Sequence, residues 1–82
     1  MSSLALAIEA AGWAGALMVL VAYGLASAGR LEPRTPLFQW LNFGGAAGFV
    51  VNSGWHGAIP SMVLNIIWCA IALFTLYQMR RA

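Results

Sequence analysis

The sequence contains no lysine and no aspartate, and charged residues of any kind are rare. Only 7% of its 82 residues are charged, as four arginines and two glutamates, whereas 62% are hydrophobic. A water-soluble domain carries charge on roughly a quarter of its residues, so this composition excludes an ordinary soluble globular fold. Four arginines are also too few to form a nucleic-acid-binding surface, so we expect the lipid bilayer, and no nucleic acid, as a partner.

Residues suited to catalysis or to metal binding are just as scarce. Cys69 is the only cysteine, which excludes a disulfide within residues 1–82, and His56 is the only histidine. Glu9 and Glu32 flank the first long apolar segment, too far apart to work as a paired acid and base. We therefore expect no enzyme activity, no catalytic residue, no metal site and no cofactor.

Long apolar segments are abundant instead. Three of them, separated by two short breaks, predict helices at about residues 5–28, 37–55 and 59–79. A helix of ~20 apolar residues crosses the ~30 Å hydrocarbon core of a bilayer, and Pro60 is tolerated because a proline fits the first turn of a helix. The sequence therefore predicts an all-α membrane protein, in which residues 1–82 form a single domain with three transmembrane helices.

The arginines predict how this domain lies in the membrane. Arg30 and Arg34 fall between the first two predicted helices, and Arg80 and Arg81 follow the third. By the positive-inside rule both clusters are cytoplasmic, which requires an even number of crossings between them, and two helices satisfy that. The prediction is an integral protein of the bacterial cytoplasmic (inner) membrane, with its N-terminus outside and its C-terminus in the cytoplasm.

Small residues on the first two predicted helices are spaced for close helix contact. Gly44 and Gly48 form a G-x-x-x-G spacing, which removes side chains from one face of a helix. Gly12 and Gly15 offer a matching stripe on the first helix. We predict these four glycines as helix-packing residues. Packing within one chain is the favoured interpretation, and a dedicated contact between two copies is the alternative.

Two amides within the apolar segments mark a candidate site. Asn52 and Asn65 both fall in the outer half of the membrane in this topology, and an amide surrounded by hydrocarbon must find a hydrogen-bond partner. Phe49 and Trp68 share their helical faces. One interpretation is that these four residues bind a small neutral polar solute. The other, favoured on the residues alone, is that the amides bond each other or a backbone carbonyl and hold the helices together.

A resemblance favours the solute site. The segment GWHGAIPSMVLNIIWCAIALFTLY (54–77), with its aromatic, glycine-rich turn and an asparagine five positions after a proline, resembles the SemiSWEET sugar transporters of the PQ-loop and SWEET superfamily. Similarity is weaker in LMVLVAYGLASAGR (17–30). The resemblance implies a three-helix bundle that transports as a pair of copies, with Asn65 in the solute pocket.

The sequence also departs from that family. Where SemiSWEETs carry a proline and a glutamine, the hinge of their rocking motion, the first helix reads Gly24, Leu25, Ala26 and Ser27. The tryptophan that stacks on the sugar in SemiSWEETs has no counterpart here, because Trp55 falls too near the outer end of the second helix. The resemblance is therefore to the fold more than to the activity, and a closely related, uncharacterised family of bacterial three-helix proteins that lacks the proline–glutamine motif is the alternative.

These patterns lead to two hypotheses about function. Because three helices are too few to enclose a route for a solute, the first is a homodimeric, SemiSWEET-like half-transporter for a small neutral polar solute such as a sugar. The second is a non-transporting accessory subunit that packs its Gly44/Gly48 face on a larger membrane complex.

Overall fold

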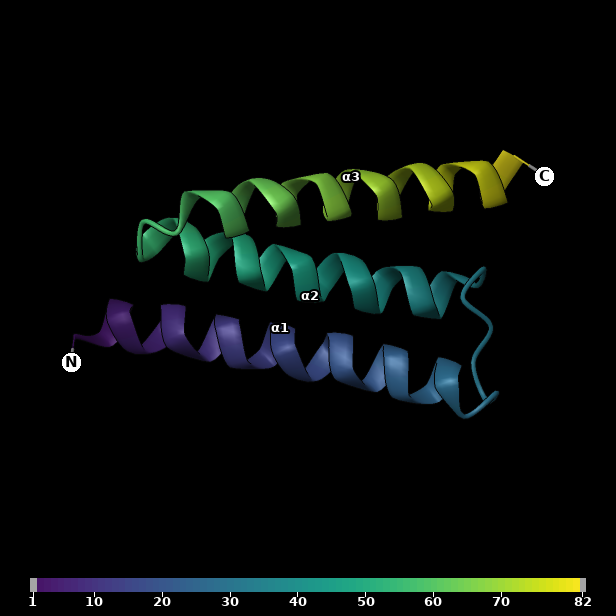
Figure 1. The fold of residues 1–82 in the computed structure, drawn as a ribbon, viewed down its shortest axis with the longest axis horizontal. Helices are drawn as coiled ribbons and strands as arrows, with labels where there is room; N and C mark the ends of the chain where they lie inside the picture. The colour runs from purple at the N-terminus through teal and green to yellow at the C-terminus, as the bar shows by residue number, and fades with distance from the viewer. Residues whose placement is uncertain (1, 82) are drawn as a thin grey trace.

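The structure, a computed structural model, describes residues 2–81 and consists of helices. It contains α1 (Ser3–Ser27), α2 (Pro36–Trp55) and α3 (Ile59–Arg81), and these residues form no strand (Figure 1). The prediction of an all-helical chain with three helices is confirmed. The helix ends lie within two residues of the predicted positions.

Local sequence explains where the helices begin and end. The side-chain oxygens of Ser2 and Thr35 accept hydrogen bonds from backbone N–H groups in the first turns of α1 and α2, at 3.0 and 3.4 Å. These bonds satisfy donors that a helix N-terminus otherwise leaves unpaired. Gly29 and Gly57, in the two connections, adopt φ angles of 74° and 72°, a left-handed conformation that glycine takes without steric cost.

The three helices form an open arrangement, nearly as deep as it is wide, which we call the layer. Helix α2 is in the middle and runs antiparallel to both neighbours, whereas α1 and α3 do not pack on each other (Figure 1). The layer measures 44 × 24 × 20 Å, and the chain enters at one end and leaves at the other (Figure 1). Because nothing from α1 or α3 closes over α2, the middle helix is accessible along a groove between its neighbours.

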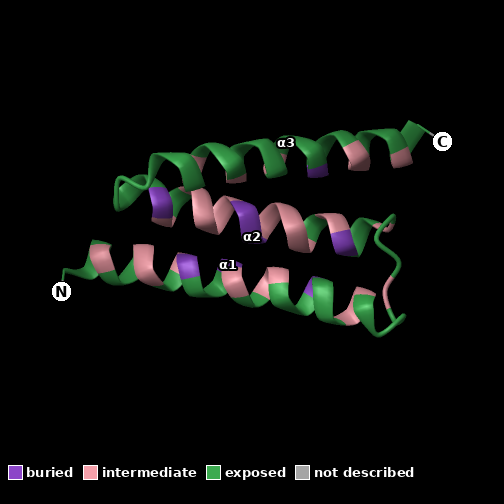
Figure 2. Ribbon diagram, in the orientation of Figure 1, coloured by how far each residue is buried: buried purple, intermediate pink, exposed green. Residues whose placement is uncertain are grey.

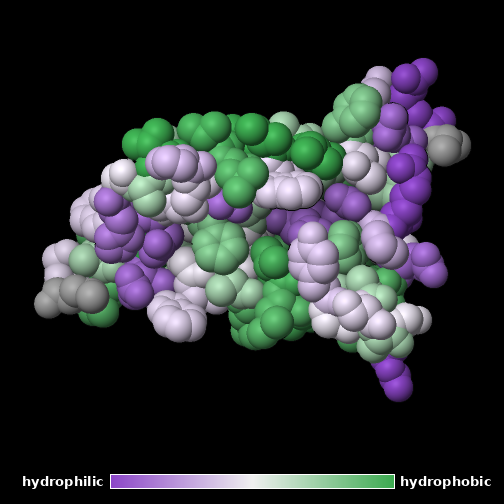
Figure 3. Space-filling view, viewed as in Figure 1, coloured by the Kyte–Doolittle hydropathy of each residue, from purple (hydrophilic) through white to green (hydrophobic). Residues whose placement is uncertain are grey.

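Most large apolar side chains of α1 and α3 are on the surface. The buried hydrophobic side chains of the layer are few, and much of α1 and α3 is exposed (Figure 2). In α3 only Ala72 is buried, whereas in α1 Trp13 is 72% and Leu20 68% exposed. Hydrophobic surface predominates along the sides of the layer, whereas hydrophilic surface gathers toward its two ends and in a patch near the middle of the view (Figure 3). Apolar exposure of this extent marks a surface that another apolar medium or protein covers.

Two of the three helices, α1 and α3, are long and apolar enough to cross a membrane. Helix α2 does not belong to this class. It is 20 residues long, but its amides Gln39, Asn42 and Asn52 and its glycines reduce its apolar character.

Helices α1 and α2 approach each other through glycines. A Cβ atom on Gly15 would lie 2.6 Å from the carbonyl oxygen of Gly45, and a Cβ atom on Gly48 would lie 2.5 Å from that of Ala11. Real Cβ atoms do not come so near to backbone atoms, so any larger residue at these positions would push the helices apart.

The other two predicted packing glycines lie on the same contact. Gly12 faces the side chain of Asn52, and Gly44 faces the end of the Met18 side chain. All four predicted glycines therefore face the opposite helix of the same chain.

Helices α2 and α3 meet through small and weakly polar groups. The hydroxyl oxygens of Ser53 and Ser61 are 2.9 Å apart, and the Cys69 thiol donates to the carbonyl oxygen of Phe43 at 3.8 Å. Ser53 is 7% exposed, so its hydroxyl is a buried group whose partner comes from the neighbouring helix. This bond fixes α3 against α2 near their connection.

Candidate functional site

A groove of about 270 Å³ lies over α2 and is lined by residues of all three helices. We call it the central groove. Helices α1 and α3 form its two sides and α2 its floor, which follows from the position of α2 in the middle of the layer. Its lining contains no charged side chain. Polar lining residues come from two helices, namely Gln39 and Asn42 from α2 and Asn65 and Thr75 from α3.

The polar lining residues hydrogen-bond to nearby backbone. Asn42, Asn65 and Thr75 each donate to the carbonyl oxygen four residues earlier in their own helix, at 3.3, 2.9 and 2.9 Å. The Gln39 amide nitrogen donates to the carbonyl oxygen of Pro33 at 2.9 Å. Among the described residues these bonds engage the amide nitrogens, so the amide oxygens stay available as acceptors.

These bonds also decide what the amides do for the fold. A side chain that bonds its own helix satisfies its donor without joining that helix to another. Asn42 therefore does not join α2 to another helix. The Asn65 amide nitrogen also lies 3.5 Å from the Ser61 hydroxyl, which contacts Ser53 of α2, so Asn65 belongs to the polar contacts between α3 and α2. The other polar side chains of the central groove, Gln39, Asn42 and Thr75, are not explained by contacts between helices.

Aromatic rings form another part of the lining, beside the aliphatic side chains of Val19, Ala46, Ile71 and Ala72. Tyr23 of α1 and Phe38 of α2 contact edge to face, with ring centroids 6.1 Å apart and planes at 75°. Phe49 of α2 and Trp68 of α3 line the groove farther along, and Trp68 is 49% exposed. Aromatic rings beside a few amides are the usual composition of a site for a small molecule.

Three of the four residues predicted for a solute site meet in the central groove. Asn65, Phe49 and Trp68 line it together, whereas Asn52 does not. Asn52 lines a separate hollow between α1 and α2, which Phe49 also touches. The expectation that the two asparagines share one pocket is corrected here, because residue 52 of α2 faces α1 while the polar lining residues of α2 face the groove.

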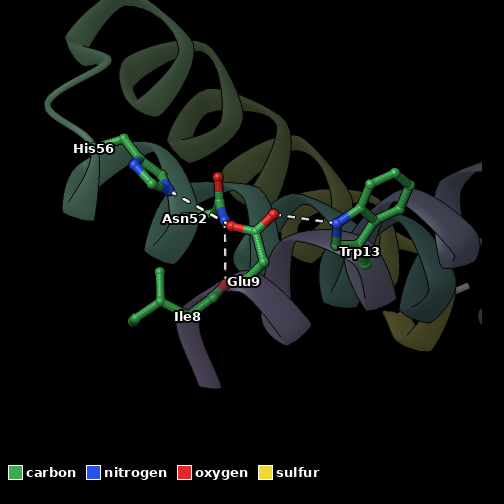
Figure 4. A network of polar contacts seen from close by, with 5 residues as sticks. All are labelled: Ile8, Glu9, Trp13, Asn52 and His56. Carbon is green, nitrogen blue, oxygen red and sulfur yellow. Dashed lines mark hydrogen bonds and ion pairs between the residues drawn. The ribbon is translucent and has the colours of Figure 1, made fainter. Parts of the chain in front are cut away.

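Asn52 instead joins two helices. Its amide nitrogen donates to the carbonyl oxygen of Ile8 in α1 at 3.1 Å, a contact between residues 44 positions apart (Figure 4). For Asn52 the structure therefore agrees with the interpretation that the amide bonds a backbone carbonyl and holds the helices together, and not with a solute site.

A small polar network surrounds this contact at the same end of the layer. The indole N–H of Trp13 donates to one carboxylate oxygen of Glu9 at 3.2 Å, and the other oxygen lies 3.8 Å from the Nε2 atom of His56 (Figure 4). Both side chains of the ion pair are about half exposed. The contact between Glu9 and Trp13 can be predicted from sequence, because residues four positions apart on a helix are neighbours. The contact between Glu9 and His56 cannot, because it depends on how α1 and α2 align.

Sequence reasoning missed several lining residues. Thr75 lies ten positions after Asn65, on the same face of one helix, so helical periodicity could have predicted Thr75 as a lining residue. Gln39 and Tyr23 lie near helix ends on different helices, and no pattern within either helix relates them to Asn65.

Comparison with known proteins places the chain in a family. A family model matches residues 8–82, which include most of α1 and the whole of α2 and α3. No curated protein and no solved structure matches the chain.

Proposed function

The chain belongs to the uncharacterised protein family whose model matches residues 8–82, and we propose that it is a half-transporter for a small neutral polar solute, working as a homodimer. In this proposal all three helices cross the bacterial inner membrane, with the N-terminus outside and the C-terminus in the cytoplasm. The observation that carries it is the gathering of amides and aromatic rings in the central groove, within a layer whose sides are mostly apolar.

The lengths and arrangement of the helices support the membrane part of the proposal. Helices of 25, 20 and 23 residues are about 37, 30 and 34 Å long, enough for a ~30 Å hydrocarbon core. Because α2 lies antiparallel between the two apolar helices, it crosses the bilayer wherever they do. The connection that carries Arg30 and Arg34 lies at the same end as the C-terminal end of α3, which matches the positive-inside rule (Figure 1).

The lining of the central groove supports a neutral, polar solute. Amide oxygens of Asn42, Asn65 and Gln39 offer acceptors, and a solute with hydroxyl or N–H groups supplies the matching donors. Phe49 and Trp68 offer apolar faces on which such a solute stacks. A charged solute would meet no opposite charge there.

The size and openness of the groove support a second copy. At about 270 Å³ the central groove is slightly smaller than the ~300–1,000 Å³ of ordinary ligand pockets, and one layer of helices does not close it. Transporters built from repeats place the solute between the repeats. A second chain facing the first across a two-fold axis completes the enclosure.

The resemblance to SemiSWEETs supports the same proposal through Asn65, which matches their pocket asparagine and lines the central groove. Helix α1 runs unbroken through Gly24 to Ser27, where those transporters have a proline hinge. In this proposal the two copies therefore alternate access by moving relative to each other, without bending of α1.

The alternative proposal, an accessory subunit, has less support from the packing. Its expected docking face was Gly44 and Gly48, and both glycines face α1 within the chain. An accessory subunit would therefore have to dock through the exposed apolar sides of α1 and α3.

Solute uptake tests the proposal. The purified chain is reconstituted in liposomes, and uptake of labelled neutral polyols and monosaccharides is compared for wild type, Asn65→Ala and Gln78→Ala. Gln78 is the matched control, because it is an amide of α3 outside the central groove. We expect uptake by wild type and Gln78→Ala, and a loss of about tenfold or more for Asn65→Ala, since a lost polar contact changes binding by about this factor.

The mass of the chain in mild detergent is the second readout. A dimer that retains its mass in Asn65→Ala shows that the lost uptake comes from the groove. A monomer that takes up none of these solutes contradicts the half-transporter and favours the accessory subunit.

A further inference from the structure

A second groove, of about 490 Å³, lies between the start of α2 and the end of α3. We call it the end groove. Its walls are mostly apolar side chains, with Arg80 at the end of α3 as its charged member. On α3 it uses Leu73, Leu76, Tyr77 and Arg80, which recur at i, i+3, i+4 and i+7. This face differs from the one that Asn65 and Thr75 present to the central groove, so the end groove is a separate site.

Aromatic side chains mark the depth of the end groove in a bilayer. Trp40 of α2 and Tyr77 of α3 line it, and both are more than half exposed, at 53% and 56%. Tryptophan and tyrosine on an exposed surface favour the level of the lipid headgroups, where one part of the ring is in hydrocarbon and the other meets water. The Arg81 guanidinium lies 5.6 Å from the centroid of the Tyr77 ring, which places a second cation at the same level.

The charge of this end of the layer is strongly positive. All four arginines of the chain lie here, in residues 30–34 and 80–81, together with one of the two glutamates, Glu32. Glu9 belongs to the polar network at the other end (Figure 4). A headgroup carrying a negative charge is therefore attracted to this end and not to the opposite one.

From this combination we infer that the end groove binds an anionic phospholipid. The inference rests on the membrane insertion in the proposed function but not on solute transport. Arg80 holds the phosphate through its paired N–H donors, and one acyl chain lies along Leu73, Leu76 and Trp40. A soluble phosphate would contact Arg80 alone and leave the apolar walls uncovered, so the groove fits a lipid better than a free anion.

Lipid binding is measured by native mass spectrometry of the full chain released from mild detergent. Dioleoyl phosphatidylglycerol is the anionic probe, dioleoyl phosphatidylcholine the zwitterionic one and inorganic phosphate the soluble one. We expect one phosphatidylglycerol per chain, bound about tenfold more tightly than phosphatidylcholine and not displaced by phosphate.

Two variants separate the groove from general surface charge. Arg80→Gln should lower the affinity for phosphatidylglycerol about tenfold, whereas Arg34→Gln should change it less than about twofold, because Arg34 carries the same charge at the same end but does not line the groove. Equal effects of the two substitutions, equal binding of the two lipids, or displacement by phosphate would overturn the inference.

A fluorescence experiment covers the case in which Arg80→Gln fails to fold. Phosphatidylglycerol with brominated chains should quench tryptophan emission, and Trp40→Phe should remove more of that quenching than Trp13→Phe, since Trp13 does not line the end groove. Equal losses for the two substitutions overturn the inference.

Flotation with pure phosphatidylcholine vesicles distinguishes the two proposals. A chain that does not float contradicts membrane insertion and the lipid site together. A chain that floats but shows no preference for phosphatidylglycerol contradicts the lipid site alone.

Discussion

Gly15 and Gly45 contact each other backbone to backbone across the α1–α2 interface. A methyl group on Gly15 would lie 2.6 Å from the carbonyl oxygen of Gly45, a distance that real side chains do not adopt. The rigid backbone of α2 has no flexible atom to move aside at this point. The approach of the two helices therefore depends on the absence of a side chain at residue 15.

We expect Gly15→Ala to destabilise the chain and Gly24→Ala to leave it unchanged or slightly more stable. The same methyl group meets the α2 backbone at residue 15 but open space at residue 24 of the same helix. Overpacking costs about 1–3 kcal/mol, whereas replacing an unconstrained helical glycine gains roughly 0.5–1 kcal/mol. The free energy of unfolding, followed by circular dichroism in detergent, measures both. Equal values for the two variants would contradict the close contact.

Asn52→Ala should loosen α1, because the bond from Asn52 to the Ile8 carbonyl oxygen crosses from one helix to the other. Hydrogen bonds between membrane helices contribute about 0.6 kcal/mol on average and at most about 1.7 kcal/mol. Asn42→Ala is the control, since Asn42 bonds its own helix. Hydrogen exchange should become faster in the first two turns of α1 in Asn52→Ala only. An equal increase in Asn42→Ala would refute the special role of Asn52.

Glu9 makes two contacts whose contributions differ. Its contact with His56, which is an ion pair only when the imidazole is protonated, joins side chains that are 43% and 54% exposed, so solvent screening keeps it to at most about 1 kcal/mol. The bond from the Trp13 indole survives in Glu9→Gln, which keeps an acceptor oxygen, but not in Glu9→Ala. We therefore expect Glu9→Ala to lower the free energy of unfolding about 1 kcal/mol more than Glu9→Gln. If the two variants are equally destabilised, the charge and not the indole bond is what matters.

The helices were predictable from sequence, whereas the neighbours of each side chain were only partly so. Apolar segments bounded by Thr35, Pro36 and the glycine-containing connections define the three helices almost to the residue. Helical periodicity places Asn65 and Trp68 on one face, and this face does line the central groove.

Periodicity does not tell which neighbour a face meets. Asn52 was grouped with Asn65 because the two lie at similar depth, but the rotation of α2 between its neighbours turns Asn52 toward α1. Gln39 and Tyr23 reach the central groove only because α2 lies in the middle of the layer, and the order of helices in a layer is not encoded in any single segment.

The orientation of α2 tests the central claim most directly, because α2 is the helix whose composition alone does not mark it as a membrane span. In a Cys69→Ser background, single substitutions Ala28→Cys and Ala58→Cys place a thiol at exposed positions in the two connections of the layer. A maleimide that does not cross membranes is applied to intact cells and then to permeabilised cells. The account predicts labelling of position 58 from outside and of position 28 only after permeabilisation. Labelling of both positions from the same side would show that α2 does not cross the bilayer and would contradict the account.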